Sequence, residues 1–206
     1  QTGYLFLLDS GGQYPDCTTD ITRTLPVGVI AKNRRAAYTR VLQGMIAVSR
    51  ARFPKGVAGG HLDVLARYPL WLDGLDYDHG TGHGVGAALS VHEGPVRLSR
   101  VSMIPLEPGM ILSNEPGYYR GGAFGIRIEN LIVVQTAAPL GETRPWLDFE
   151  TITLCPIDTR LILRDLMTSD EVAWLNAYHA RVWSEIGPLV SGETQVWLQQ
   201  ACAPLA

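Results

Sequence analysis

Cysteine is scarce in this 206-residue sequence, and long apolar runs are missing from it. Cys17, Cys155 and Cys202 are an odd, widely spaced set without a CxxC motif, which fits neither a disulfide framework nor a zinc ribbon. This cysteine use favours a reducing compartment, so we expect a cytoplasmic protein. The longest apolar runs, such as residues 4–8, fall far short of the roughly 18 to 20 residues that a membrane helix needs. We therefore expect a soluble chain with no membrane partner.

A block of basic residues is also missing. Seventeen Lys and Arg residues stand against twenty Asp and Glu residues, and the formal net charge is −3. Nucleic acid is therefore not an expected partner, because no basic stretch could neutralise a row of phosphates. The glycine-rich stretch 80–86 contains neither GKS/T nor GxGxxG, which disfavours a phosphate loop. What the sequence does have is an ordinary globular composition, 46% hydrophobic and 18% charged, which is enough for one core.

Hydrophobic patterning predicts an α+β chain. An apolar strand over residues 4–8, which ends in a turn at Asp9, and an alternating strand over 18–25 form a predicted hairpin. Further strands are predicted over 110–116, 125–134 and 149–154, in an antiparallel sheet, and helices over 32–53, 61–68, 169–186 and 193–201. No repeat or linker divides the chain. We expect one domain over residues 1–206, with a C-terminal helical tail from about residue 160.

Five polar residues interrupt the apolar strands or accompany them: Asp9, Asp20, His83, Glu115 and Glu129. Each is expected to be buried or half-buried, and a lone carboxylate in a sheet core costs several kcal/mol unless it is paired or bound to a cation. Four carboxylates and one imidazole are mostly hard oxygen donors. They are too many for one tetrahedral zinc ion, but they suit two divalent ions such as manganese, cobalt or iron. The sequence therefore predicts a dinuclear metal site.

Strand alternation indicates which of these side chains point together. In the predicted strand over 125–134, Arg127 and Glu129 share one face. The segment 79–86 has the HxxxH spacing of a zinc-binding helix, but each of its glycines would cost a helix about 1 kcal/mol relative to alanine. An extended conformation fits better, and it places His79, Thr81 and His83 on one face.

Six sequence blocks in combination resemble aminopeptidase P (X-Pro aminopeptidase), a family of pita-bread metallopeptidases. They are Leu8-Asp9-Ser10-Gly11, Thr19-Asp20-Ile21-Thr22-Arg23-Thr24, His79-Gly80-Thr81-Gly82-His83-Gly84-Val85-Gly86, Val91-His92-Glu93-Gly94-Pro95, Asn114-Glu115-Pro116-Gly117-Tyr118-Tyr119 and Gly125-Ile126-Arg127-Ile128-Glu129-Asn130. The resemblance runs from residue 4 to about 200 and is closest to the three-domain form of the enzyme. It implies the pita-bread fold, a curved antiparallel sheet with flanking helices.

The family has a further catalytic histidine, and the first strands and helices of its fold, upstream of the position that matches Tyr4. The chain begins with Gln1 and shows no initiator methionine. We therefore expect a C-terminal catalytic fragment of a longer protein, with the N-terminal part of the fold missing. That missing part is an expected partner of the fragment.

The resemblance implies a role for each matched residue. The metal ligands are Asp9, Asp20, His83, Glu115 and Glu129, with Asp20 and Glu129 bridging the two ions. The catalytic set is Glu115, His79, His92, Arg127 and Tyr119. Glu115 is the general base, while His79 and His92 bind substrate and stabilise the tetrahedral intermediate. Tyr119 and Arg127 form a supporting hydrogen-bond network, whereas His61 and His179 match no motif and are assigned structural roles.

The implied activity is that of a metal-dependent, proline-specific hydrolase. It would release the N-terminal residue from peptides with proline in the second position, using water activated by two divalent ions, with manganese expected and cobalt, iron or zinc as alternatives. A homodimer is expected. The alternatives are a prolidase, which cleaves X-Pro dipeptides, and an inactive fragment that acts only as a binding module. A creatinase relative is disfavoured, because creatinase needs no metal and all five ligands are retained here.

Overall fold

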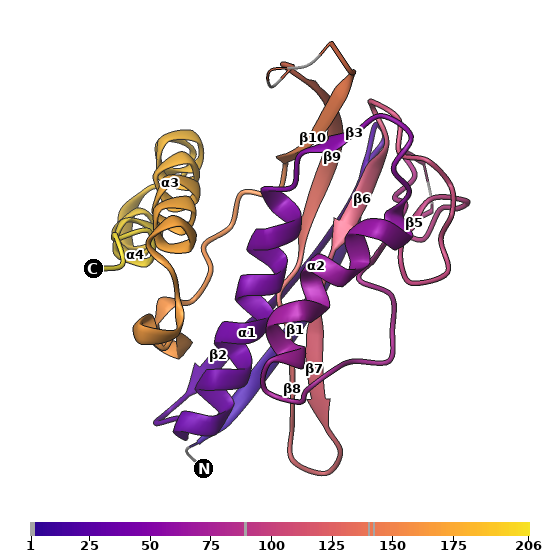
Figure 1. Ribbon diagram of the computed structural model, residues 1–206. Helices are drawn as coiled ribbons and strands as arrows, with labels where there is room; N and C mark the ends of the chain where they lie inside the picture. Colours follow the sequence, from indigo (N-terminus) through magenta and orange to yellow (C-terminus); the bar gives the residue numbers. More distant parts are fainter. Residues whose placement is uncertain (1–2, 89, 140, 142) are drawn as a thin grey trace.

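A long antiparallel hairpin opens the computed structural model, which describes residues 3–88, 90–139, 141 and 143–206 (Figure 1). Its strands are β1 (Tyr4–Gln13) and β2 (Thr18–Val27), and their register places Asp9 opposite Thr22 and Gly11 opposite Asp20. Directly opposed residues point to the same face, so Asp9, Asp20 and Thr22 share one face. The predicted turn at Asp9 is wrong: β1 continues to Gln13, and Gly12 N donates to Thr19 Oγ1 at 3.0 Å.

Helices α1 (Lys32–Ser49) and α2 (Gly59–Trp71) pack against each other and against the strands. The helix predicted to begin at residue 32 is present as α1, and its Val41, Leu42 and Met45 side chains are fully buried. The predicted ends differ: α1 stops at Ser49, and α2 continues through Pro69. A proline in the last turn removes only one late hydrogen bond, and the fully buried Leu70 keeps that turn against the core.

The central sheet has four antiparallel strands in the order β3–β10–β9–β6. They are β3 (Phe53–Pro54), β6 (Ile111–Asn114), β9 (Asn130–Ala137) and β10 (Trp146–Thr151). Two short antiparallel pairs adjoin it: β4 (Gly82–His83) with β5 (Arg97–Leu98), and β7 (Gly117–Arg120) with β8 (Phe124–Arg127). The antiparallel prediction is confirmed, and a bridge between Gly84 and Leu112 joins the β4 segment to β6.

The prediction of one continuous strand over 125–134 is wrong. The structure divides it into β8 and β9 and leaves Glu129 in the break. Glu129 N donates instead to the carbonyl oxygen of Thr22, at 3.0 Å, so the chain leaves its β7 partner to contact β2 before it enters the central sheet. β7 itself was not predicted. It pairs with β8 across a turn in which Gly122 has a φ of 70°, a conformation that favours glycine.

The two helices predicted over 169–186 and 193–201 are present in the C-terminal part. Short turns η1 (Thr159–Leu161) and η2 (Arg164–Leu166) precede α3 (Ser169–Ile186), and η3 (Gly187–Leu189) connects it to α4 (Gly192–Ala201). Helix α3 begins with a capping box: Thr168 N donates to Glu171 Oε2 at 2.8 Å, and Glu171 N donates to Thr168 Oγ1 at 3.3 Å. None of the helices that the structure describes has the length and apolarity to span a bilayer.

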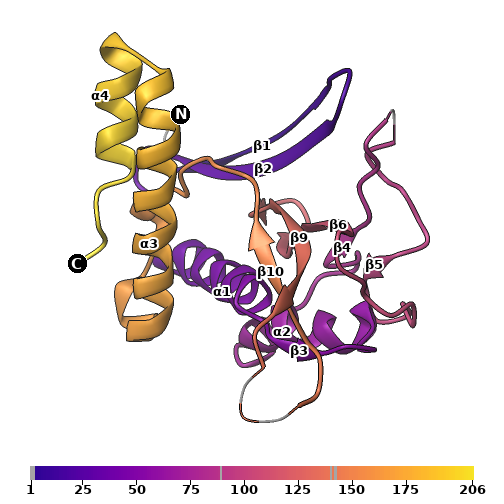
Figure 2. The same ribbon diagram turned by 90° about the horizontal axis from the view of Figure 1, so that it is seen from above.

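The elements form layers around the polar residues of interest. In Figure 2 the β1–β2 hairpin runs along one side of the molecule and α1 and α2 along the other, with β6 and β9 between them. Helices α3 and α4 flank one end of this arrangement. The hairpin, β4, the end of β6 and the β8–β9 break therefore approach one another, and these four segments carry the five predicted metal ligands.

Candidate metal centre

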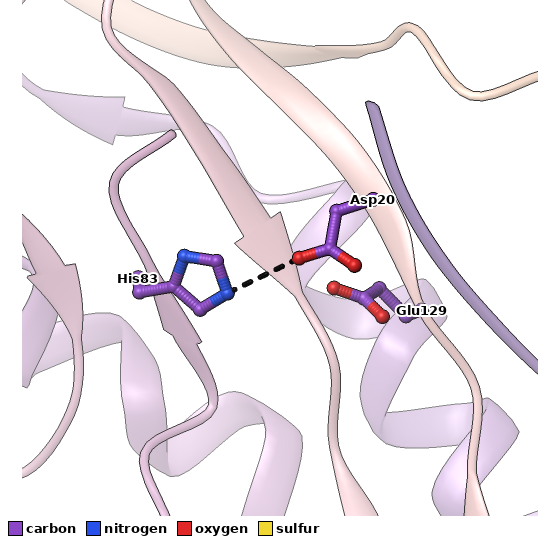
Figure 3. Close-up of side chains that lie close together, drawn as sticks. All are labelled: Asp20, His83 and Glu129. Atoms are coloured by element: carbon purple, nitrogen blue, oxygen red, sulfur yellow. Dashed lines mark ion pairs between the residues drawn. The ribbon is translucent and has the colours of Figure 1, made fainter. Parts of the chain in front are cut away.

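Asp20, His83 and Glu129 come together from three separate segments. Each offers a ligand atom, and these atoms all lie within 4.8 Å of one another. The ion pair between His83 Nε2 and Asp20 Oδ2 measures 3.5 Å, and Figure 3 shows the three side chains pointing toward a common space. Asp20 and Glu129 are buried, and His83 is half-buried. The predicted convergence of these residues is what the structure shows.

Glu129 is held at one carboxylate oxygen only. Thr22 Oγ1 donates to Glu129 Oε2 at 2.6 Å, whereas Glu129 Oε1 is buried and has no hydrogen-bond partner among the described residues. Burial, reinforced by the negative charges of Glu115, Asp20 and Asp9, raises the pKa of Glu129 to about 8. A buried oxygen without a donor, in a negative environment, is what a bound cation would satisfy.

Glu115 lies just beyond β6, next to His83. Its Oε1 is 3.2 Å from His83 Nε2 and accepts a hydrogen bond from Ser113 Oγ at 3.0 Å. Ser113 Oγ in turn accepts a hydrogen bond from His83 N at 2.9 Å, so one serine orients both residues. Burial raises the pKa of Glu115. Burial alone would lower the pKa of His83, but hydrogen bonding to Asp20 and to the Gly84 carbonyl, with the nearby Glu115 charge, raises it overall.

Arg127 connects Asp9 to this cluster. Its Nη2 lies 2.5 Å from Asp9 Oδ2, its Nε donates to Thr22 Oγ1 at 3.1 Å, and its Nη1 donates to Tyr119 Oη at 3.0 Å. A longer contact of 3.7 Å joins Nε to Glu115 Oε2. Asp9 shares the hairpin face of Asp20, but its side chain is 51% exposed and stands outside the group of three.

The remaining predicted residues border a cleft of about 750 Å³. His79 Nε2 lies 3.0 Å from Tyr119 Oη, and burial lowers the pKa of His79, which favours the neutral imidazole. His92 is exposed, and its ring stands edge-on to that of His83, with centroids 4.2 Å apart. The cleft is lined by Asp9, His79, His83, His92, Glu115 and Arg127, among others. All nine predicted residues thus belong to one site or touch it directly.

Several supporting residues were missed by sequence reasoning. Arg23 lies in one of the matched sequence blocks and was given no role, but it is buried, and its Nη1 donates to the Glu129 carbonyl oxygen at 2.5 Å. Its Nη2 donates to Asn130 Oδ1 at 2.8 Å and lies 3.2 Å from Tyr178 Oη on α3. The signal available in the sequence was an arginine among apolar neighbours. Glu129, Asn130 and Tyr178 lie more than 100 residues away in the sequence, and no local pattern identifies them as partners.

The donor set fits divalent cations. Carboxylate oxygens dominate, one neutral imidazole nitrogen can join them, and the orphaned Glu129 Oε1 faces no competing donor among the described residues. Four carboxylates, from the hairpin, the end of β6 and the β8–β9 break, concentrate negative charge here. Among the described residues, Arg127 and His83 make direct ion-pair contacts with them. The arrangement can therefore hold metal and place a carboxylate and two further histidines beside it.

The chain belongs to metallopeptidase family M24. The model of that family matches residues 1–136, and a model of the C-terminal region of peptidase M24 matches residues 145–205. The curved antiparallel strands with their flanking helices are the pita-bread fold of this family. The predicted fold class is confirmed.

Two relatives that are about half identical to this chain are named as aminopeptidases P. The chain is 53% identical over 207 residues to "Aminopeptidase P2" of Arabidopsis thaliana, covering 98% of this chain and 29% of that protein. It is 48% identical to a "Probable Xaa-Pro aminopeptidase P" of Laccaria bicolor, covering 98% and 32%. The chain thus spans about a third of the length of these relatives.

Solved structures of an aminopeptidase and of a prolidase also resemble this chain. The X-prolyl aminopeptidase of Caenorhabditis elegans, described as a cytosolic enzyme with a di-nuclear active site, has a TM-score of 0.91 and 42% identity, covering 98% of this chain and 33% of that one. The prolidase of Pyrococcus furiosus has a TM-score of 0.60 and 33% identity, covering 65% and 39%. Similarity to the aminopeptidase therefore extends over the C-terminal helices as well.

Proposed function

We propose that the protein containing this chain is an X-Pro aminopeptidase, a hydrolase that releases the N-terminal residue from peptides with proline in the second position. The observation that carries the proposal is the convergence of Asp20, His83 and Glu129 within 4.8 Å, with Glu129 Oε1 buried and unpartnered among the described residues. The names of the similar proteins support the substrate class.

Asp9, Asp20, His83, Glu115 and Glu129 would hold two divalent ions. Such ions, when bound, supply Lewis acidity and a water of lowered pKa. The di-nuclear site of the C. elegans protein supports the number two. The oxygen-rich donor set favours manganese, with cobalt, iron or zinc as alternatives.

The chain's own residues would move the proton and bind the substrate. Glu115, whose pKa burial raises, would take the proton of the attacking water and return it to the leaving amine. His92, exposed in the cleft, would donate to the developing oxyanion, an interaction worth roughly 3 to 4 kcal/mol when a single donor is lost. His79 would position the peptide, while Arg127 and Tyr119 fix its imidazole and the Asp9 carboxylate.

The direct test is cleavage by the natural full-length protein loaded with manganese. We expect it to hydrolyse an X-Pro-X tripeptide and to bind two metal ions per chain, and we expect chelation to abolish the activity. Failure to cleave the tripeptide with both ions bound would contradict the proposal.

Prolidase activity is the second candidate, because prolidase structures share the fold over 65% of this chain. The assay separates the two: a prolidase cleaves the X-Pro dipeptide in preference to the tripeptide. The similarity to the aminopeptidase over 98% of the chain favours the first reading. The isolated fragment, assayed in parallel, tests the alternative of an inactive binding module.

The cellular location and assembly are further parts of the proposal. The cytosolic description of the C. elegans protein and the three unpaired cysteines support a cytoplasmic protein. The homodimer stays a prediction, which sedimentation of the full-length protein would test.

A further inference from the structure

A buried ion pair on α2 lies behind the segment that carries His79. Arg67 Nε and Asp63 Oδ2 are 2.7 Å apart, and the two side chains are only 3% and 2% exposed. They are one helical turn apart on the face of α2 that turns toward the rest of the protein. None of the roles proposed above involves either residue.

The Arg67 guanidinium holds the backbone immediately before and at His79. Nη1 donates to the carbonyl oxygen of Tyr77 at 2.6 Å and Nη2 donates to that of His79 at 2.7 Å. Nη1 also reaches Asp76 Oδ1 at 2.9 Å, and the guanidinium carbon lies 4.0 Å from the centroid of the Tyr77 ring. A planar group with donors in fixed directions can hold two carbonyls at once, which a lysine ammonium cannot reproduce.

Asp63 holds the same segment two residues further on. Thr81 Oγ1 donates to Asp63 Oδ1 at 2.7 Å, and Thr81 is fully buried. The carbonyl oxygen of Thr81 then accepts a hydrogen bond from Glu115 N at 2.7 Å. The ion pair therefore contacts the extended segment on both sides of Gly80.

A buried ion pair is weak support for stability by itself, because the loss of solvation offsets most of the attraction. The polar contacts of this pair are directed almost entirely at residues 76–81, the segment that leads to His79 and His83. His79 in turn has its ring 4.8 Å from that of Tyr77 and its Nε2 at 3.0 Å from Tyr119 Oη. The geometry suits a positional role.

We propose that Arg67, held in place by Asp63, is a positioning residue for His79 in the peptidase reaction. This inference rests on the X-Pro aminopeptidase function proposed above. Arg67 lies outside the cleft lining and acts by fixing the backbone from which the His79 imidazole projects into the cleft.

A double-mutant cycle on the metal-loaded full-length protein tests the inference. The variants are Arg67→Lys, His79→Ala and the combination, assayed with an X-Pro-X tripeptide. We expect Arg67→Lys to lower kcat/KM by about 10- to 100-fold, because a small displacement of a positioning group has effects of this size. The loss should be shared between kcat and KM in the same proportion as in His79→Ala. In the His79→Ala background, we expect Arg67→Lys to cost less than about 2-fold, because its effect is transmitted through His79.

Three controls keep the interpretation specific. Arg40→Lys alters a half-buried arginine outside the cleft lining, whose Nε is 2.8 Å from Asp73 Oδ2, and it should leave kcat/KM unchanged. Metal content should stay at two ions per chain in the Arg67 variant. Asp63→Asn, which keeps the shape of the side chain, should repeat the non-additive pattern and replaces Arg67→Lys if that variant does not fold.

The outcomes are distinguishable. Additive losses in the cycle, or loss of metal from Arg67→Lys, would overturn the inference while leaving the proposed function in place. A wild-type protein that binds two ions but cleaves no X-Pro peptide would overturn the proposed function and this inference together.

Discussion

Thr22 Oγ1 donates a hydrogen bond to Glu129 Oε2 at 2.6 Å, across 107 positions of sequence. The same hydroxyl accepts a hydrogen bond from Arg127 Nε at 3.1 Å. Thr22 therefore fixes which oxygen of Glu129 is satisfied by the protein and which is left for a cation. Thr22 thus links Arg127, which pairs with Asp9, to the Glu129 carboxylate.

Replacing Thr22 tests this relationship. Thr22→Val keeps the shape of the side chain but removes the donor to Glu129 and the acceptor for Arg127. Loss of an outer hydrogen bond of this kind lowers metal affinity by about 10- to 100-fold, and we expect that range from metal titration by calorimetry. Thr39→Val, another fully buried threonine, bonded to the Arg35 carbonyl on α1, serves as the matched control. Equal metal affinities for the wild type and Thr22→Val would contradict the assigned role.

Metal removal should lower the stability of the protein. Asp20, Glu115 and Glu129 lie close together and are buried or half-buried, so without cations their mutual repulsion and burial oppose the folded state. We expect chelation to lower Tm and added manganese to raise it with concentration. Glu129→Gln should be more stable than the wild type when both are stripped of metal, and should gain less from manganese. A Tm that does not respond to metal would argue against the site.

Substitutions of Glu115 and of His92 should differ in their effects on turnover and on metal binding. Glu115→Ala removes a proposed ligand and the general base together, so we expect no measurable turnover and weakened metal binding. His92→Ala removes one oxyanion donor, so we expect a rate about 100- to 1,000-fold lower with both ions still bound. Metal analysis of the two variants checks this division, and an empty site in His92→Ala would refute it.

His179 should make stability depend on pH. It is fully buried on α3, its Nε2 accepts a hydrogen bond from Ile157 N at 3.1 Å, and burial lowers its pKa to about 4. Between pH 6.5, the ordinary pKa of histidine, and about pH 4, the unfolded chain binds a proton at His179 that the folded chain does not. The contribution of His179 to the free energy of unfolding is therefore complete above this pH range and is lost as the pH falls through it. The loss attributable to His179 is about 3 kcal/mol at most.

The variant His179→Gln isolates this contribution. Its amide oxygen can accept from Ile157 N but does not titrate. Urea unfolding at pH 7.5, 6 and 5 should show a wild-type advantage that shrinks as the pH falls, and a constant difference across the range would exclude the effect.

Much of the fold followed from local pattern. The β1–β2 hairpin, α1, α3 and the antiparallel sheet were predicted, because alternation and helical periodicity act over a few positions. The errors lie where distant contacts prevail: Glu129 N bonds to Thr22 rather than continuing a strand, and Leu70 keeps Pro69 inside a helix. The choice between these outcomes is made by packing partners that the local sequence does not contain.

For the site, the sequence by itself determined the chemistry: four carboxylates and three histidines in an order typical of one family, on segments of predictable conformation. Only the tertiary structure decided how each group is held. Tertiary contacts leave Glu129 Oε1 without a donor among the described residues. They also bring Asp9 into an ion pair with Arg127, and the Asp63–Arg67 pair into contact with the backbone of His79. The reason is physical, since a side chain's donor and acceptor types are fixed by its identity, whereas its partners are fixed by the approach of segments far apart in the chain.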